Sequence, residues 1–334
     1  MEVYKLLIKL EDQFDIFYSN IGYGYPYLIR HNIPFITHFR ASHRHLRNVH
    51  FKSTYFNIFS IENLKDFIYH QYYSFIEFYL AKKSDLLIFN SEETKKKFIQ
   101  YNKIPIEKTH VIPNGVGIPV FPSIEKEFLK KKLNLSPKKI LLFVGRLTYD
   151  KNIDRLIHLM KDLKIREDIV LLIIGDGELF EKIQEDIIRY ELKEKILLLG
   201  AMKNDLIFSY YAVADLYIHP TTPGTTLIEA MASYTPFIVY RKFNDNSSGI
   251  PIEEIKKSNS GIFLEDCEFY HFSQKILEVI DDKNWLQFAG SNGGKFVREE
   301  MNWEKIAEKT QKHISLTINN FKKKNPKFQI HFDI

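Results

Sequence analysis

The hydrophobic positions of this chain form short apolar runs separated by segments with helical spacing. In the second half, three such runs each end in a glycine, at residues 141–145, 171–175 and 196–200. A short apolar run is typical of a buried strand, and a helical segment lies between one run and the next. The pattern predicts an α/β protein in which strands alternate with helices.

The first half has the same alternation with less regular spacing. We predict strands at residues 14–18, 34–38, 85–90 and 110–113, an amphipathic helix at 1–10 and a long aromatic-rich helix at 61–82. Ser91 is expected to cap a helix over residues 92–101, because its hydroxyl can accept a hydrogen bond from a free N–H of the first turn. The polar, lysine-rich segment 119–137 is bracketed by prolines, which indicates a crossing into a second domain plus a short helix.

Residues 220–239 contain a strand end, a turn, a short helix and the next strand. Helical composition at 227–232 follows Pro223 and Gly224. The start of a helix presents unpaired N–H groups and a positive dipole end, which suits a phosphate. Glu229 lies one turn further in, where a carboxylate can accept hydrogen bonds from ribose hydroxyls. Taken alone, this stretch fits a plain turn and core helix equally well.

Several motifs follow one another in an order and spacing that together are more specific than any one of them. They are Val-Gly-Arg-Leu at 144–147 with Lys151-Asn152, Gly-Asp-Gly at 175–177, Ala214-Asp215 ahead of His219-Pro220, and Glu-Ala-Met-Ala at 229–232. This series resembles the donor domain of retaining glycosyltransferases of the GT-B fold, family GT4. The resemblance implies an α/β architecture with two Rossmann-like domains facing a cleft.

The resemblance also implies the domain boundaries. Residues 1–118 correspond to an acceptor-side Rossmann-like domain, 119–303 to the domain that binds the nucleotide-sugar donor, and 304–334 to a last helix that packs back on the first domain, plus a tail. The family normally opens with a further strand and a Gly-rich loop, which this chain lacks. We therefore expect a shortened first domain.

The diphosphate of a nucleotide sugar must be neutralised by guanidinium, ammonium and backbone N–H groups where no metal is bound. Arg146 follows Gly145 at a strand end, and Lys151 lies in the loop before the next helix, so both can point into one cleft. The resemblance assigns both cations to the donor phosphates, with no metal and no cofactor beyond the nucleotide-diphosphate sugar as substrate. Surface salt bridges are the alternative interpretation.

Glu229 matches the second glutamate of the family's signature, which holds the donor ribose. The first glutamate would stand eight residues earlier, where this chain has Thr221. This departure predicts an altered sugar preference or a weakened activity, although Thr221 and Thr222 can still hydrogen-bond sugar hydroxyls. The other predicted donor-binding residues are Gly145 and the amides of Gly224, Thr225, Thr226 and Leu227, with Gly175, Asp176 and Met202 near the base or ribose.

His38 falls at the carboxyl end of the strand predicted at 34–38, where ligands of open α/β sheets gather. The resemblance places it beside the reacting sugar, so we predict a catalytic role for it together with Arg146, Lys151 and Glu229. A structural histidine is the alternative.

The residues that follow, up to 52, are rich in cations and histidines. We predict that Arg40, His43 and Arg44 lie on the acceptor side, able to contact a phosphate-bearing acceptor or anionic headgroups. A solvated loop is the alternative, and a metal site is disfavoured because the arginines would repel the cation.

Composition and charge indicate the compartment and the kinds of partner that are expected. The chain has 334 residues, 45% hydrophobic, and a formal net charge of +5, which is weak evidence for nucleic acid, so no nucleic-acid partner is predicted. The single cysteine, Cys267, excludes an internal disulfide and agrees with a reducing cytosol. No signal peptide and no apolar run near the ~20 residues of a membrane span is visible. We predict a cytoplasmic protein, at most peripheral at the inner face of a membrane.

Together these features predict a metal-independent glycosyltransferase that acts with retention of configuration in polysaccharide or glycolipid biosynthesis. Its partners would be a nucleotide sugar and a glycan, lipid-linked or other hydroxyl acceptor. The alternative is a non-catalytic or partner-dependent nucleotide-sugar-binding protein, which Thr221 and the short first domain both favour.

Overall fold

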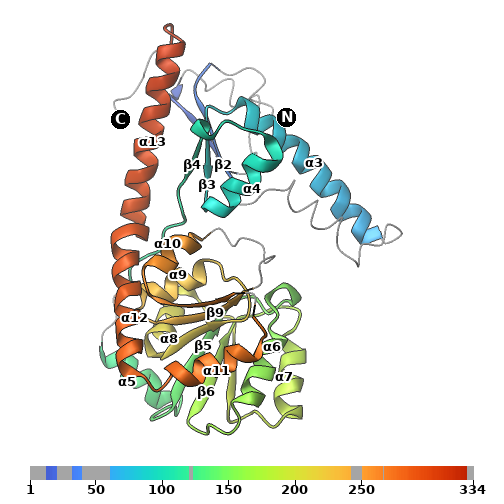
Figure 1. Ribbon diagram of the computed structural model, residues 1–334, viewed down its shortest axis with the longest axis vertical. Coiled ribbons are helices and arrows are strands. Elements are labelled where there is room, and N and C mark those ends of the chain that lie inside the picture. Colours follow the sequence, from blue (N-terminus) through green and yellow to red (C-terminus); the bar gives the residue numbers. More distant parts are fainter. Residues whose placement is uncertain are drawn as a thin grey trace. The chain divides into compact units, whose positions relative to one another are not determined.

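The computed structural model describes residues 13–20, 32–39, 61–119, 123–241, 250–265 and 267–328 (Figure 1). The chain divides into two compact units. The first comprises Met1–Asn114, Gly249–Pro251 and Glu304–Ile334, and the second comprises Gly115–Ser248 and Ile252–Trp303. The helix predicted at residues 1–10 lies outside the described residues.

The first unit contains a parallel sheet with helices packed on both faces. Its elements are β1 (Phe17–Asn20), β2 (Phe35–Phe39), α3 (Ile61–Lys83), β3 (Leu86–Phe89), α4 (Glu92–Asn102), a 3-10 turn (Ile106–Lys108), β4 (Thr109–Val111) and α13 (Trp303–Lys324). The strands follow one another in the order β1-β2-β3-β4. Leu87 and Phe89 face a core formed with α3 and α4, whereas Leu86 and Ile88 face a second core with Ile306 of α13.

In this unit, β1 starts later than predicted, whereas the predicted cap of α4 is present. The strand expected at 14–18 begins only at Phe17, because the register pairs Phe17 with Phe35, the first residue of β2. The predicted cap of α4 is confirmed, since the Ser91 hydroxyl accepts a hydrogen bond from the backbone N–H of Thr94 at 3.2 Å.

The second unit contains a six-stranded, fully parallel sheet in the order β10-β9-β8-β5-β6-β7. Its strands are β5 (Lys139–Val144), β6 (Ile169–Ile174), β7 (Ile196–Gly200), β8 (Leu216–His219), β9 (Phe237–Arg241) and β10 (Gly261–Glu265). Its helices are α5 (Ser123–Lys132), α6 (Asp154–Asp162), α7 (Phe180–Arg189), α8 (Asn204–Val213), α9 (Thr225–Ala232), α10 (Ile252–Lys257), α11 (Tyr270–Val279) and α12 (Lys283–Phe296), followed by a π turn (Val297–Met301). The expected alternation of strands and helices is confirmed.

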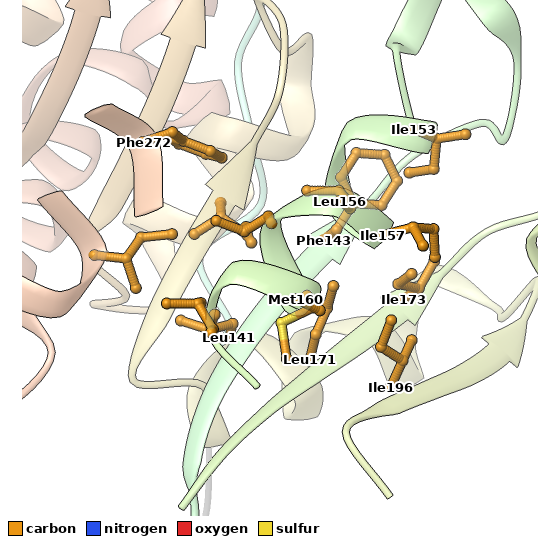
Figure 2. Packing of buried hydrophobic residues seen from close by; sticks show 14 of the residues in the cluster. Leu141, Phe143, Ile153, Leu156, Ile157, Met160, Leu171, Ile173, Ile196 and Phe272 are labelled. Atoms are coloured by element: carbon orange, nitrogen blue, oxygen red, sulfur yellow. The ribbon is translucent and has the colours of Figure 1, made fainter. Parts of the chain in front are cut away.

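Apolar residues on both sides of the strands cause helices to cover both faces of this sheet. On one face, Leu141 and Phe143 of β5 pack with Leu156 and Met160 of α6 and with Phe272 of α11 (Figure 2). On the other face, α8, α9 and α12 lie against one another (Figure 1). The unit is therefore a doubly wound α/β fold, as the apolar runs predicted.

The strand order changes direction once, between β5 and β8. From β5 the chain adds β6 and β7 on one side, and it then returns to add β8, β9 and β10 on the other side. The loops that leave β5 and β8 therefore diverge toward opposite faces. In open α/β sheets, this switch point at the carboxyl ends of the strands is where ligands bind.

Candidate functional site at the carboxyl edge of the second sheet

Because all six strands are parallel, the loops that follow them begin at the same edge of the sheet. The loop after β5 holds Gly145, Arg146 and Lys151, and the loop after β8 holds Thr221 and Thr222. Loops after β6 and β7 bring Gly175, Asp176 and Met202 to this edge. The fold thus brings these predicted donor-binding residues to one edge of the sheet.

Glycines allow the loops after β5 and β6 to pack backbone on backbone. The N–H of Gly145 donates to the carbonyl of Ile174 at 3.0 Å, and that of Leu147 donates to the carbonyl of Asp176 at 2.9 Å. The carboxylate of Asp176 accepts from the N–H of Gly177 at 2.7 Å, while its side chain is exposed. Gly175 and Gly177 therefore have a structural role, and a contact of Gly175 or Asp176 with a base or ribose stays a prediction.

Arg146 and Lys151 face one carboxylate oxygen. Nη2 of Arg146 lies 3.8 Å from Oδ2 of Asp150, and Nζ of Lys151 lies 3.6 Å from the same atom. The hydroxyl of Thr148 donates to Oδ1 of Asp150 at 2.5 Å. Burial raises the pKa of Asp150. The Thr148 hydrogen bond, and after it the two cations, outweigh burial and lower the pKa. The two predicted phosphate ligands thus both lie within 4 Å of Asp150, a residue that the sequence did not single out.

His219 contacts β5 and the loop after β8. Its ring lies at the end of β8, with its centroid 5.0 Å from that of Phe143 in β5, and its Nδ1 lies 2.7 Å from the carbonyl oxygen of Thr221. Burial, with a smaller effect of the Lys151 charge, lowers the pKa of His219 to about 3, against the opposing effects of the Thr221 hydrogen bond and the Asp150 charge. The imidazole is therefore neutral, and Nδ1–H can donate to Thr221.

Thr221 and Thr222 differ in their surroundings although both are buried. The hydroxyl of Thr221 lies 3.4 Å from Nδ1 of His219. The hydroxyl oxygen of Thr222 is buried and has no hydrogen-bond partner among the described residues. A buried hydroxyl without a partner is costly, which makes Thr222 the better candidate of the two for a ligand contact.

The first turn of α9 lies directly after these threonines. Gly224 is its N-cap residue and supplies no side-chain hydrogen bond, so the N–H groups of Thr225 and Thr226 are not capped by a side chain of this residue. The N–H of Leu227 donates to the carbonyl of Gly224 at 3.3 Å. An uncapped N-terminus with a positive dipole end suits an anion. The helix begins at Thr225, directly after Pro223 and Gly224, as predicted.

Glu229 is held by a buried tyrosine of α8. The hydroxyl of Tyr211 donates to Oε2 of Glu229 at 3.1 Å, and the hydroxyls of Tyr217 and Thr226 are 2.9 Å apart. Burial raises the pKa of the Glu229 carboxyl, and the Tyr211 hydrogen bond opposes that shift. Among the functional candidates, sequence reasoning missed Asp150, Tyr211 and the buried ring of His219, of which only His219 stood in a recognised motif.

His38 lies in the first unit, at the carboxyl end of β2 as predicted. Its Nδ1 lies 2.8 Å from the Tyr18 hydroxyl, and its Nε2 lies 2.5 Å from Oδ1 of Asn90. The amide oxygen can only accept, so Nε2 carries the proton and Nδ1 accepts from Tyr18. Arg40, His43 and Arg44 lie outside the described residues.

Within the described residues, no group of three His, Cys, Asp or Glu could hold a metal ion. No helix among them has the length and apolar character that a membrane span needs.

Known proteins match this chain along most of its length. The family model for glycosyl transferases group 1 matches residues 125–296, and that for glycosyltransferase family 4 matches residues 2–118. The uncharacterized glycosyltransferase MJ1607 of Methanocaldococcus jannaschii is 27% identical over 70% of this chain and 61% of its own length. The Escherichia coli UDP-Gal:alpha-D-GlcNAc-diphosphoundecaprenol alpha-1,3-galactosyltransferase is 30% identical over 63% of this chain and 55% of its own length.

These alignments span less than two thirds of either relative. Among solved structures, HepE of Anabaena in complex with UDP has a TM-score of 0.74 at 19% identity, with 94% of this chain and 82% of HepE covered. The fold expectation is thereby confirmed. This chain belongs to the glycosyl transferases group 1, of the GT4 type, and has the GT-B fold.

Proposed function

We propose that this protein transfers a sugar from a nucleotide-sugar donor to a hydroxyl acceptor. The observation that carries the proposal is the convergence of Arg146 and Lys151 on one carboxylate oxygen, at the switch point of a parallel sheet. Two cations that meet one anionic oxygen in this place are suited to a diphosphate. The uncapped start of α9 supplies backbone N–H groups from the adjacent loop.

In the proposed reaction, the bond between the anomeric carbon and the donor's phosphate oxygen breaks, and the acceptor oxygen bonds to that carbon on the same face. The acceptor proton passes to the leaving diphosphate. Arg146 and Lys151 stabilise the charge that develops on this group, which makes a metal ion unnecessary. Glu229 accepts hydrogen bonds from the ribose, and His38 contributes from the acceptor side.

Two relatives support a narrower proposal for the substrates. HepE was solved with UDP, and the E. coli relative uses UDP-Gal and an acceptor linked to diphosphoundecaprenol. We therefore place a uridine-diphosphate sugar first among donors, and a lipid-linked or glycan hydroxyl first among acceptors. The net charge of +5 agrees with an anionic acceptor and with peripheral attachment to an anionic membrane surface.

The test combines binding and turnover. Purified protein would be screened with UDP-, GDP-, ADP- and TDP-sugars for thermal stabilisation. Transfer of the sugar to added acceptors, with release of nucleoside diphosphate, would be measured in the presence of EDTA. Lys151→Met should weaken binding of the active donor about 10- to 100-fold, the effect of losing a charged hydrogen bond. Lys164→Met, which removes a cation paired with Glu191, is the matched control and should bind like the wild type. Equal loss in both variants would contradict the proposal.

A second function is favoured by the position of Thr221. A non-catalytic or partner-dependent nucleotide-sugar-binding protein would need the cations but not a carboxylate eight residues before Glu229, and here that position holds a buried threonine against His219. Tight donor binding without hydrolysis or transfer, unchanged in Thr221→Glu, would favour this alternative. Transfer by the wild-type chain would exclude it.

A further inference from the structure

Asp150 stands between the two cations that the proposed function assigns to the donor's diphosphate. Its Oδ2 is 3.8 Å from Arg146 and 3.6 Å from Lys151, and among the described residues no other carboxylate lies within 4 Å of either cation. The three side chains come from one short loop, between β5 and α6.

The contacts of Asp150 with Arg146 and Lys151 are long, whereas its contact with Thr148 is short. Both ion pairs exceed hydrogen-bond length, and the Arg146 and Asp150 side chains are 73% and 58% exposed. Such pairs contribute little to stability and are screened by water. The 2.5 Å hydrogen bond from Thr148 instead holds the opposite oxygen, Oδ1, and so fixes where the carboxylate stands. Asp150 is thus a weakly bound anion held in place by Thr148.

A diphosphate that binds both cations would meet this carboxylate. Phosphate oxygens pair with guanidinium in a bidentate geometry and carry more charge than a carboxylate, so they replace Oδ2. Burial raises the pKa of Asp150, but the Thr148 hydrogen bond and both cations outweigh burial and lower the pKa, so the carboxylate that the diphosphate meets is ionised near neutral pH. The carboxylate must rotate away, and its negative charge then remains beside the ligand.

We propose that Asp150 occupies the place of the donor's diphosphate between Arg146 and Lys151 in the unliganded protein, and that the incoming diphosphate displaces it. This inference rests on the proposed function. Asp150 thereby screens the two cations from other anions and lowers the affinity for product nucleoside diphosphate, which favours its release.

The variant Asp150→Asn tests this directly, since the amide keeps an oxygen that can accept from Thr148 but loses the charge. UDP and inorganic pyrophosphate would be titrated calorimetrically into both proteins at low and high salt. We expect binding about 3- to 10-fold tighter in the variant, with a larger gain at low salt. Asp186→Asn, which removes a carboxylate paired with Arg189 on α7, controls for net charge and should leave binding unchanged.

Measuring the effect of Asp150→Asn in a Lys151→Met protein distinguishes displacement of Asp150 by the ligand from general repulsion between Asp150 and the ligand. In Lys151→Met, the gain from Asp150→Asn should shrink, because the contested cation is gone. Equal or weaker binding by Asp150→Asn, in a variant with wild-type thermal midpoint, would overturn the inference and leave the proposed function standing. Absence of diphosphate binding by the wild type as well would overturn both.

Discussion

The carbonyl oxygen of Gly145 occupies the space where a side chain on residue 175 would begin. A Cβ built on Gly175 would stand 1.8 Å from that oxygen, and the φ of Gly175 is +150°, a value that side-chain-bearing residues rarely adopt. The end of β6 therefore depends on glycine in order to approach the loop that carries Arg146 and Lys151.

We expect Gly175→Ala to lower the free energy of unfolding by at least about 3 kcal/mol, because backbone strain and the clash with a backbone oxygen act together. Urea denaturation followed by circular dichroism would measure it. Gly117→Ala is the matched control, since a Cβ there meets nothing within 4 Å, and it should change stability by less than about 1 kcal/mol. Similar losses in both variants would contradict the close approach at Gly175.

The two buried threonines Thr222 and Thr235 should respond to valine with opposite signs. The Thr222 hydroxyl has no partner among the described residues, whereas the Thr235 hydroxyl donates to the carbonyl of Tyr211 at 2.6 Å. Thr222→Val should therefore raise the unfolding free energy of the unliganded protein by about 1 kcal/mol, and Thr235→Val should lower it by about 1 kcal/mol. If Thr222 contacts the donor as proposed, Thr222→Val should also bind the nucleotide sugar more weakly. A loss of unliganded stability in Thr222→Val would show that its hydroxyl is already satisfied.

His219 should make the protein sensitive to acid. Above pH 6.5 its imidazole is neutral in both the folded and the unfolded chain. Between pH 6.5 and about 3, the unfolded chain binds a proton that the buried ring does not, so stability falls as the pH falls, by about 1.4 kcal/mol per unit for this group. Urea unfolding at several pH values should show a shallower slope in His219→Gln than in the wild type. His158→Gln, on the exposed side of α6, should retain the wild-type slope.

A second acid-sensitive contact joins β4 to α13 in the first unit. The rings of His110 and His313 have centroids 4.2 Å apart, and burial lowers the pKa of both, with Lys95 acting on His110, and His110 and Lys312 on His313. Burial thus favours the neutral form of both rings. Their contribution to the free energy of unfolding is present above pH 6.5 and is lost as the pH falls through their lowered pKa values. His313→Phe keeps a ring in contact and should reduce the acid dependence of stability. An unchanged profile would mean that the pair does not titrate as inferred.

The hydrogen bond from Tyr211 should keep Glu229 ionised. Burial raises the pKa of this carboxyl and Tyr211 opposes the shift, so Tyr211→Phe should raise the pKa further. If Glu229 binds the ribose as a carboxylate, nucleotide affinity in Tyr211→Phe should begin to fall at a higher pH than in the wild type. Calorimetric titration of UDP between pH 5 and 8 would measure this. Parallel pH profiles would indicate that the Tyr211 hydrogen bond does not act on ligand binding.

The sequence by itself determined the strands β5, β6 and β7, the helix α9 with the strand β9 that follows it, and the position of Arg146 and Lys151 after a strand end. It could do so because buried strands require apolar runs and glycine turns that are local in the chain. Only the tertiary structure placed β5 beside β8, and with that pairing the His219 ring against Phe143. It also decided that Asp150 stands between two cations and that Tyr211 holds Glu229. Apolar spacing could not reveal these contacts, since they depend on strand order and side-chain direction.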